Sequence, residues 1–199
     1  INFEYASTRD SIGEHAAALR ELVAGLPADT RLSFVGHSMG NIVIRHAIGD
    51  WQRGNEQSTL QRIEHVVMLG PPNQGAAIAR QLSKSRVFGW VTGQAGMELG
   101  PHWAEFEDKL AVPPCPFGIV AGHLPENNFQ NPLVDGASDF VVSVEEAHLT
   151  GEADFLEVPR LHSFLMDDPA VQRAVANFIR YQRFAAPAVD EQVSPVATR

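Results

Sequence analysis

The stretch RLSFVGHSMGN, residues 31–41, decides how the rest of the chain is interpreted. Its first part, residues 32–35, combines β-branched and aromatic side chains and predicts a buried strand. Residues 36–40 then place a serine between two glycines. The apolar residues that follow, 42–44 and Ala47, predict a helix. The stretch therefore predicts a sharp strand-to-helix turn with Ser38 at its tip.

The glycines that flank Ser38 have a steric explanation. A turn this sharp strains the serine backbone and brings its flanks close to the neighbouring strand and helix, where Gly36 and Gly40 have no Cβ atom to clash. The turn lifts the Ser38 hydroxyl above the sheet edge. It also aims the backbone N–H of Met39, at a helix N-terminus, at any oxyanion formed there. Strand, Gly-x-Ser-x-Gly and helix in this order define a nucleophile elbow.

Composition and charge exclude several classes of function. The formal net charge of −9 argues against a nucleic-acid partner and against electrostatic attachment to an anionic membrane. No run approaches the roughly 18 apolar residues of a membrane span. The single cysteine, Cys115, cannot form an internal disulfide, and no histidines have a metal-motif spacing. We therefore expect neither a metal nor another cofactor.

Strands and helices are expected to alternate along the chain. The expected strands are residues 1–5, 32–35, 63–69, 117–122 and 155–158. Helices are expected after Ser11, which has capping-box spacing to Glu14, after the elbow as far as about Gly49, and from Pro169. Residues 53–61 are expected to form a polar loop. This alternation predicts one α/β domain with a mostly parallel sheet and helices on both faces.

The elbow sequence Gly36-His37-Ser38-Met39-Gly40, in this context, resembles that of the α/β-hydrolase superfamily. Within it, the lipase-like serine esterases often have Gly-His-Ser-Met/Leu-Gly here. The resemblance covers nearly all of residues 1–184 and implies an α/β-hydrolase fold. Pro72-Asn73-Gln74-Gly75 is also similar to a Pro-Asn/His-x-Gly segment of these enzymes, at the sheet edge where α/β proteins bind ligands. A plain Gly/Pro turn is the alternative interpretation.

Two further segments extend the predicted domain organisation. Residues 76–116 form a long insertion rich in apolar residues, among them Phe88, Trp90 and Trp103. In the resembled fold this position often holds a cap over the active site, and the alternative is a helical excursion packed on the core. From residue 185 onward the Pro/Ala/polar composition predicts a flexible tail. We expect a hydrolase domain over residues 1–184 and a tail over 185–199.

A serine hydroxyl needs a base within hydrogen-bond reach, and that base needs an acid to orient it. In this fold the chain order is serine, acid, histidine. His162 is the expected base because it follows the last strand and precedes the last helix. The run of residues 161–165, with Asp168 downstream, resembles the family's histidine segment. His123 is the alternative base, while His37 is expected to point away from Ser38 and to pack.

Two aspartates compete for the role of the acid. The family often has Asp-Gly-Val-Val before a small residue and a valine, and residues 139–144 fit this pattern with Phe140 in place of the glycine. Asp135 is the rival. Asp139 is favoured because the apolar pair Val141 and Val142 follows it, as in the family.

One part of the expected machinery is not found in the sequence. A tetrahedral oxyanion needs two donors, and only the Met39 N–H is assigned. The second usually comes from a loop often marked by His-Gly, which this chain lacks. The strand before that loop would lie upstream of Ile1. We therefore expect the N-terminal strands of the fold to belong to a longer polypeptide, and self-association through the sheet edge left exposed.

The resulting expectation is a serine hydrolase that cleaves carboxylic esters, including lipid or other acyl esters, through an acyl-enzyme. Ser38 would attack, His162 would carry the proton, Asp139 would orient His162, and the Met39 N–H would hold the oxyanion. A thioesterase or acyltransferase of the same fold would use the same residues. A hydrolase-fold binding protein without catalysis is the alternative from a different class. The expected location is the cytoplasm.

Overall fold

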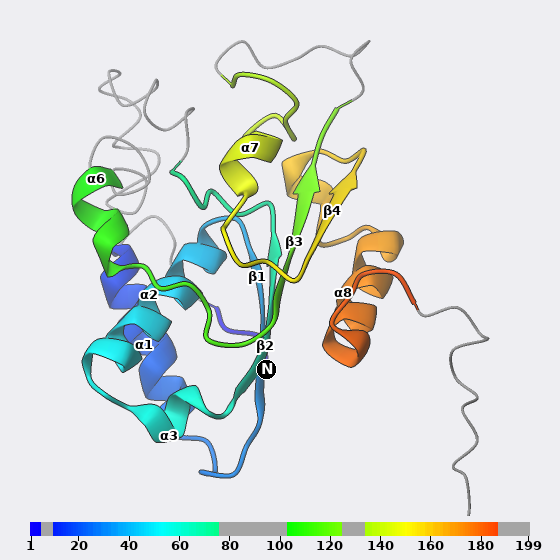
Figure 1. The fold of residues 1–199 in the computed structure, drawn as a ribbon. Helices are drawn as coiled ribbons and strands as arrows, with labels where there is room; N and C mark the ends of the chain where they lie inside the picture. The colour runs from blue at the N-terminus through cyan, green and yellow to red at the C-terminus, as the bar shows by residue number, and fades with distance from the viewer. Residues whose placement is uncertain (5–9, 76–102, 125–133, 187–199) are drawn as a thin grey trace, which may run out of the picture.

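The described residues are built around a parallel four-stranded sheet (Figure 1). The computed structural model describes residues 1–4, 10–75, 103–124 and 134–186. The strands lie in the order β1-β2-β3-β4, and every neighbouring pair is parallel. Their bounds are Leu32–His37 (β1), Ile63–Leu69 (β2), Phe117–Gly122 (β3) and Asp154–Val158 (β4).

Helices cover both faces of this sheet (Figure 1). On one side lie α1 (Ile12–Ala24), α2 (Met39–Arg53) and α3 (Gln57–Leu60), and on the other α8 (Pro169–Tyr181). Shorter elements are α6 (Trp103–Phe106), η1 (Glu107–Lys109), α7 (Val144–Ala147) and η2 (His162–Phe164). The predicted fold class is thus confirmed. Among the described residues, no helix is long and apolar enough to cross a membrane.

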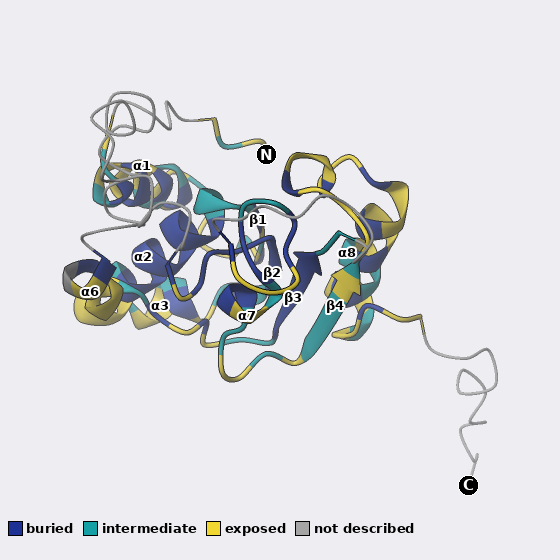
Figure 2. Cartoon of the chain, turned by 90° about the horizontal axis from the view of Figure 1, so that it is seen from above, coloured by how far each residue is buried: buried dark blue, intermediate teal, exposed yellow. Residues whose placement is uncertain are grey.

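The core consists of two apolar layers, one on each face of the sheet. Along β2, Val66 and Met68 pack into the layer under α1 and α2, whereas Val67 and Leu69 pack into the layer under α8. Every residue of β3 is buried. Seen from above, buried residues gather around β2, β3 and α2, and the outer sides of the helices are exposed (Figure 2). Burial on both faces explains why β3 and residues 66–69 of β2 are continuous apolar runs in the sequence.

Helix starts follow the sequence more closely than helix ends. Ser11 and Glu14 form the predicted capping box of α1, and Asp168 caps α8 with Pro169 in the first turn. The predicted end of the elbow helix near Gly49-Asp50 is wrong, because α2 continues to Arg53. A Cβ atom on Gly49 would lie 2.3 Å from the Lys109 carbonyl oxygen, so this glycine allows close packing. The predicted loop of residues 53–61 contains α3.

The predicted strand at residues 1–5 is also wrong for the part that the structure describes. Residues 1–4 have no regular secondary structure, and Ile1 is 92% exposed. A strand needs a neighbour for its backbone groups, and among the described strands β1 pairs only with β2. Within the described part of the chain, no strand pairs with the other edge of β1, and Val35 in this strand is exposed. Self-association through this edge remains a proposal.

The cap and the tail fall largely outside the described residues. The described end of the long insertion contains α6, whose Trp103 and Phe106 are buried in the layer under α1 and α2. This end therefore packs on the core, as the alternative interpretation expected. Phe88 and Trp90, and residues 187–199 of the tail, lie outside the described part of the chain, so a cap over the site remains a prediction.

Candidate active site

Ser38 lies at a strained turn between β1 and α2. Its φ of 54° and ψ of −129° are values that a non-glycine residue rarely adopts. The turn is held in place because the Ser38 N–H donates to the Leu69 carbonyl at 2.9 Å and the Asn41 side chain donates to the Ser38 carbonyl at 3.0 Å. A Cβ atom on Gly36 would lie 2.3 Å from the Asn41 Oδ1 atom. The steric reason predicted for this glycine is confirmed.

Two further glycines let a distant segment approach the same sheet edge. They are Gly70, just after β2, and Gly122, at the end of β3. A Cβ atom on Gly70, whose φ is +51°, would lie 3.0 Å from the His162 Nδ1 atom. A Cβ atom on Gly122 would lie 2.5 Å from the Arg160 carbonyl oxygen. The turn after β4 can therefore lie directly against the ends of β2 and β3, close to Ser38.

The His162 ring lies between Ser38 and Asp139. Its Nε2 atom is 2.8 Å from the Ser38 Oγ atom, and its Nδ1 atom is 2.7 Å from the Asp139 Oδ2 atom. A carboxylate only accepts, so the proton of the neutral ring belongs on Nδ1. Nε2 is then free to accept the hydroxyl proton of Ser38. The His162 and Asp139 side chains are both buried, which shields these hydrogen bonds from water.

The Asp139 carboxylate is held by the loop that follows it. Its Oδ1 atom accepts hydrogen bonds from the backbone N–H groups of Val141, at 3.0 Å, and Val142, at 2.8 Å. The Asp139 carbonyl oxygen accepts from the His162 N–H at 2.9 Å. Phe140, in the middle of this turn, has a φ of +84°. The turn thus needs the left-handed conformation that favours the glycine of the family pattern.

The histidine segment is also anchored at its far end. Arg160 donates through Nε to the Asp168 carboxylate, and the same carboxylate accepts from the first N–H groups of α8. These hydrogen bonds, with the one from Arg160 first, lower the pKa of Asp168. The carboxylate therefore ties the turn that carries His162 to the start of α8.

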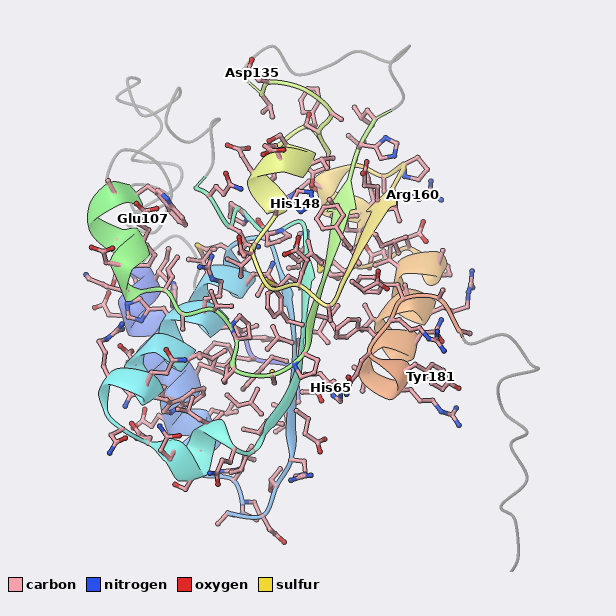
Figure 3. The ribbon with its side chains drawn as sticks, viewed as in Figure 1. His65, Glu107, Asp135, His148, Arg160 and Tyr181 are labelled. Carbon is pink, nitrogen blue, oxygen red and sulfur yellow. The ribbon has the colours of Figure 1, made fainter. Side chains whose placement is uncertain are left out.

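The other candidates from the sequence are not brought to Ser38. Asp135 is exposed, at the outer end of its loop above α7 (Figure 3). His123, the alternative base, lies just after β3, and no described contact joins it to Ser38 or Asp139. Met39 is the first residue of α2, so its N–H belongs to the open N-terminus of that helix. Within the described residues, no three His, Cys, Asp or Glu side chains are placed to hold a metal ion.

The segment after β2 turns its asparagine toward the interior. Asn73 is buried, and Arg45 donates through Nη1 to both its carbonyl oxygen and its Oδ1 atom. The Asn73 amide donates to the Ala147 carbonyl at 2.7 Å. Burial lowers the pKa of Arg45 to about 10. These contacts favour a structural turn that joins α2 to α7 over a direct role in binding.

The structure also shows a contact that sequence reasoning missed. His37 was expected only to pack, but its ring also has a polar partner beside the site. Its Nε2 atom lies 2.9 Å from the His162 carbonyl oxygen. No sequence signal could have revealed this hydrogen bond, because the two histidines are 125 positions apart and meet only in the folded chain.

The chain matches one family model in sequence and several solved structures in fold. The family model described as "Putative serine esterase (DUF676)" matches residues 11–88, which run from α1 past the end of β2. This match spans less than half of the chain, and it includes Ser38 but neither Asp139 nor His162. No curated protein matches the chain significantly.

Three solved structures illustrate the similarity in fold. The mature Bacillus licheniformis lipase BlEst2 has a TM-score of 0.59 and 16% identity, covering 88% of this chain and 76% of that one. A metagenomic carboxyl esterase has a TM-score of 0.57 and 18% identity, covering 77% and 52%. The Legionella pneumophila phospholipase PlaB has a TM-score of 0.54 and 20% identity, covering 73% and 36%.

These matches define the class of protein. The chain has the α/β-hydrolase fold, of the type found in lipases and esterases. The matching family model is described as a putative serine esterase, and the three structural neighbours are a lipase, a carboxyl esterase and a phospholipase.

Proposed function

We propose that this protein is a serine hydrolase that cleaves carboxylic esters through an acyl-enzyme, with Ser38, His162 and Asp139 as its catalytic triad. The observation that carries the proposal is the continuous pair of hydrogen bonds from Ser38 Oγ to His162 Nε2, at 2.8 Å, and from His162 Nδ1 to Asp139 Oδ2, at 2.7 Å. Nucleophile, base and orienting acid are then within the reach that this chemistry requires.

The first half of the proposed reaction acylates Ser38. The Ser38 oxygen attacks the ester carbonyl carbon while its proton passes to His162 Nε2. The resulting oxyanion accepts a hydrogen bond from the Met39 N–H, at the N-terminus of α2. The intermediate then collapses, and the alcohol oxygen leaves with the proton from His162. Asp139 faces the protonated ring through Nδ1 and stabilises its positive charge.

The second half releases the acid. Water gives a proton to His162 Nε2 and attacks the acyl carbon through the same face. When the second tetrahedral intermediate collapses, His162 returns its proton to the Ser38 oxygen and the carboxylic acid leaves. The strained elbow assists both steps, because the fixed Ser38 backbone holds the hydroxyl at the base before substrate binds.

A fluorophosphonate probe tests the nucleophile directly, since it labels only an activated serine. We expect the wild-type protein to be labelled and Ser38→Ala not to be. The matched control is Ser163→Ala, which changes an exposed serine beside His162 and should leave labelling intact. Labelling that persists in Ser38→Ala contradicts the assignment, and a folded wild type that resists the probe favours a non-catalytic binding protein.

A series of p-nitrophenyl esters of rising acyl length then addresses the substrate. Hydrolysis that depends on Ser38 supports the ester class, and the chain-length profile separates short-chain esterase from lipase activity. An acyltransferase would instead form a new ester when a second alcohol competes with water. A thioesterase would prefer the matching thioester. All of these activities would use the same triad, and they differ only in the leaving group or in the acceptor of the acyl group.

A further inference from the structure

His37 is a polar residue beside the nucleophile that the proposed reaction does not use. It ends β1 and directly precedes Ser38, but its half-buried ring lies against the turn that carries His162. The two histidine rings have centroids 4.8 Å apart. The His37 Nε2 atom is 2.9 Å from the His162 carbonyl oxygen. Because a carbonyl oxygen can only accept, Nε2 of His37 carries the proton and donates it.

This hydrogen bond completes the restraint on the His162 backbone. The His162 N–H donates to the Asp139 carbonyl at 2.9 Å, and its own carbonyl accepts from His37. The His162 N–H is thus held by the acid loop, and its carbonyl is held by the strand of the nucleophile and, at 3.4 Å, by the Leu165 N–H. His37 is also the residue next to Ser38 in the chain. Its hydrogen bond therefore links the backbone of the base to the residue beside the nucleophile.

We propose that His37 is a positioning residue. Its Nε2–H holds the His162 main chain in the position that keeps His162 Nε2 within hydrogen-bond reach of Ser38. The inference rests on the proposed function, in which His162 is the base. His37 itself does not touch the reacting atoms, because its contact is to a backbone carbonyl.

The charge of His37 suits this role. Burial and the neighbouring His162 lower the pKa of His37, against the opposing effects of the hydrogen bond to the His162 backbone and the carboxylates of Asp139 and Asp167. A lowered pKa keeps the ring neutral at neutral pH. A neutral His37 donates one hydrogen bond without placing a positive charge beside His162 when that ring accepts the proton of Ser38.

Two substitutions separate hydrogen bonding from packing. His37→Phe keeps an aromatic ring and removes the donor, whereas His37→Gln keeps an N–H donor at similar reach and removes the ring. We expect His37→Phe to lower kcat between about 10- and 100-fold with KM nearly unchanged, since small displacements of catalytic groups have effects of this size. His37→Gln should stay within about threefold of wild type. The control His65→Phe, at a histidine on β2 that contacts Ser33, should leave kcat unchanged.

A spectroscopic measurement tests the contact without relying on activity. In protein labelled with ¹⁵N-histidine, each neutral ring shows which nitrogen carries its proton. We expect His37 to be protonated at Nε2 and His162 at Nδ1, with the His37 signal identified by its loss in His37→Gln. In His37→Phe the His162 signal should shift, and in His65→Phe it should not. A wild-type His37 ring protonated at Nδ1 overturns the proposal, whether or not the phenylalanine variant folds.

The possible failures are distinguishable. If no variant hydrolyses esters but the two rings show the expected tautomers, the proposed function fails and the contact stands. If Ser38-dependent hydrolysis is present and His37→Phe retains wild-type kcat, the positioning role is wrong. If His37→Gln is folded and loses as much activity as His37→Phe, the ring rather than its N–H is responsible, and the proposal is also wrong.

Discussion

The two halves of the candidate site are built in different ways. The elbow around Ser38 is local, since a strand, a turn and a helix of one short stretch create it, and Gly36 leaves room for its tight contacts. The acid–base half joins Asp139 to His162 across 23 positions and includes a phenylalanine with a φ of +84°. Strain in the elbow aims a nucleophile. In the acid loop, the strained residue is Phe140, which stands where the family pattern has a glycine.

The largest expected effect lies in the elbow. Ser38→Ala should lower kcat by about 10⁶-fold, because a triad acts as a unit and the nucleophile has no substitute. The free energy of unfolding should change little, since the backbone hydrogen bonds of the turn do not involve the hydroxyl. Ester hydrolysis and thermal unfolding of the same samples test both statements. A variant that keeps more than a thousandth of wild-type kcat would require another nucleophile.

The next effect lies in the acid loop. Asp139→Asn should lower kcat by about 10⁴-fold, because the amide can donate to His162 Nδ1 and so favours the wrong tautomer of the ring. The matched control is Asp135→Asn, four positions earlier, whose side chain is exposed and has no described contact with His162. We expect the control to stay within about twofold, as is usual for a surface change. Reversed results would make Asp135 the acid.

The same contrast between local and long-range structure explains which parts of the fold could be predicted from the sequence. Residues 32–44 contain the whole elbow, so periodicity and glycine sterics are enough to predict its strand, turn and helix. β2 and β3 have their predicted bounds, because residues 66–69 of β2 and all of β3 are buried apolar runs that are covered on both faces. The capping box of α1 and the proline of α8 are equally local signals.

Long-range contacts account for what could not be predicted. Gly49 lies inside α2 and packs closely against the distant Lys109 carbonyl, and residues 1–4 pair with none of the described strands. The proximity of Asp139 and His162 was expected only through resemblance to a family, since neither residue is marked by spacing alone. The hydrogen bond from His37 to His162 had no local signal, because it exists only after β1 and the turn after β4 meet.

A smaller effect is expected on packing within the elbow. In Gly36→Ala the new methyl group would lie 2.3 Å from Asn41 Oδ1 and 2.9 Å from Ile44 Cδ1. Asn41 cannot move freely, because its amide donates to the carbonyl groups of Ser38 and Leu69. We expect the free energy of unfolding to fall by about 1–3 kcal/mol, the usual cost of overpacking.

Gly136→Ala offers a contrast, since no atom lies within 4 Å of its Cβ position. Any loss of stability in Gly136→Ala should come only from the positive φ of this residue. Urea unfolding of both variants measures the difference between their free energies of unfolding.

The smallest expected effect concerns the strained turn in the acid loop. Phe140 occupies the left-handed region with a φ of +84°, where a side chain costs about 1 kcal/mol relative to glycine. Replacing the phenylalanine also removes its packing, so one variant alone cannot isolate the strain. The pair Phe140→Ala and Phe140→Gly can, because both lose the ring and only the alanine keeps a Cβ atom.

At an ordinary position alanine is the more stable of the two, since glycine gives the unfolded chain more freedom. At position 140 we expect the order to be inverted, with Phe140→Gly more stable than Phe140→Ala by about 1 kcal/mol in urea unfolding. Both variants should retain the Asp139 turn and therefore most of kcat, since the N–H groups that bind the carboxylate belong to Val141 and Val142. If alanine proves more stable, the left-handed conformation at position 140 imposes no cost, and of the two turns, the elbow and the acid loop, only the elbow that presents Ser38 is strained.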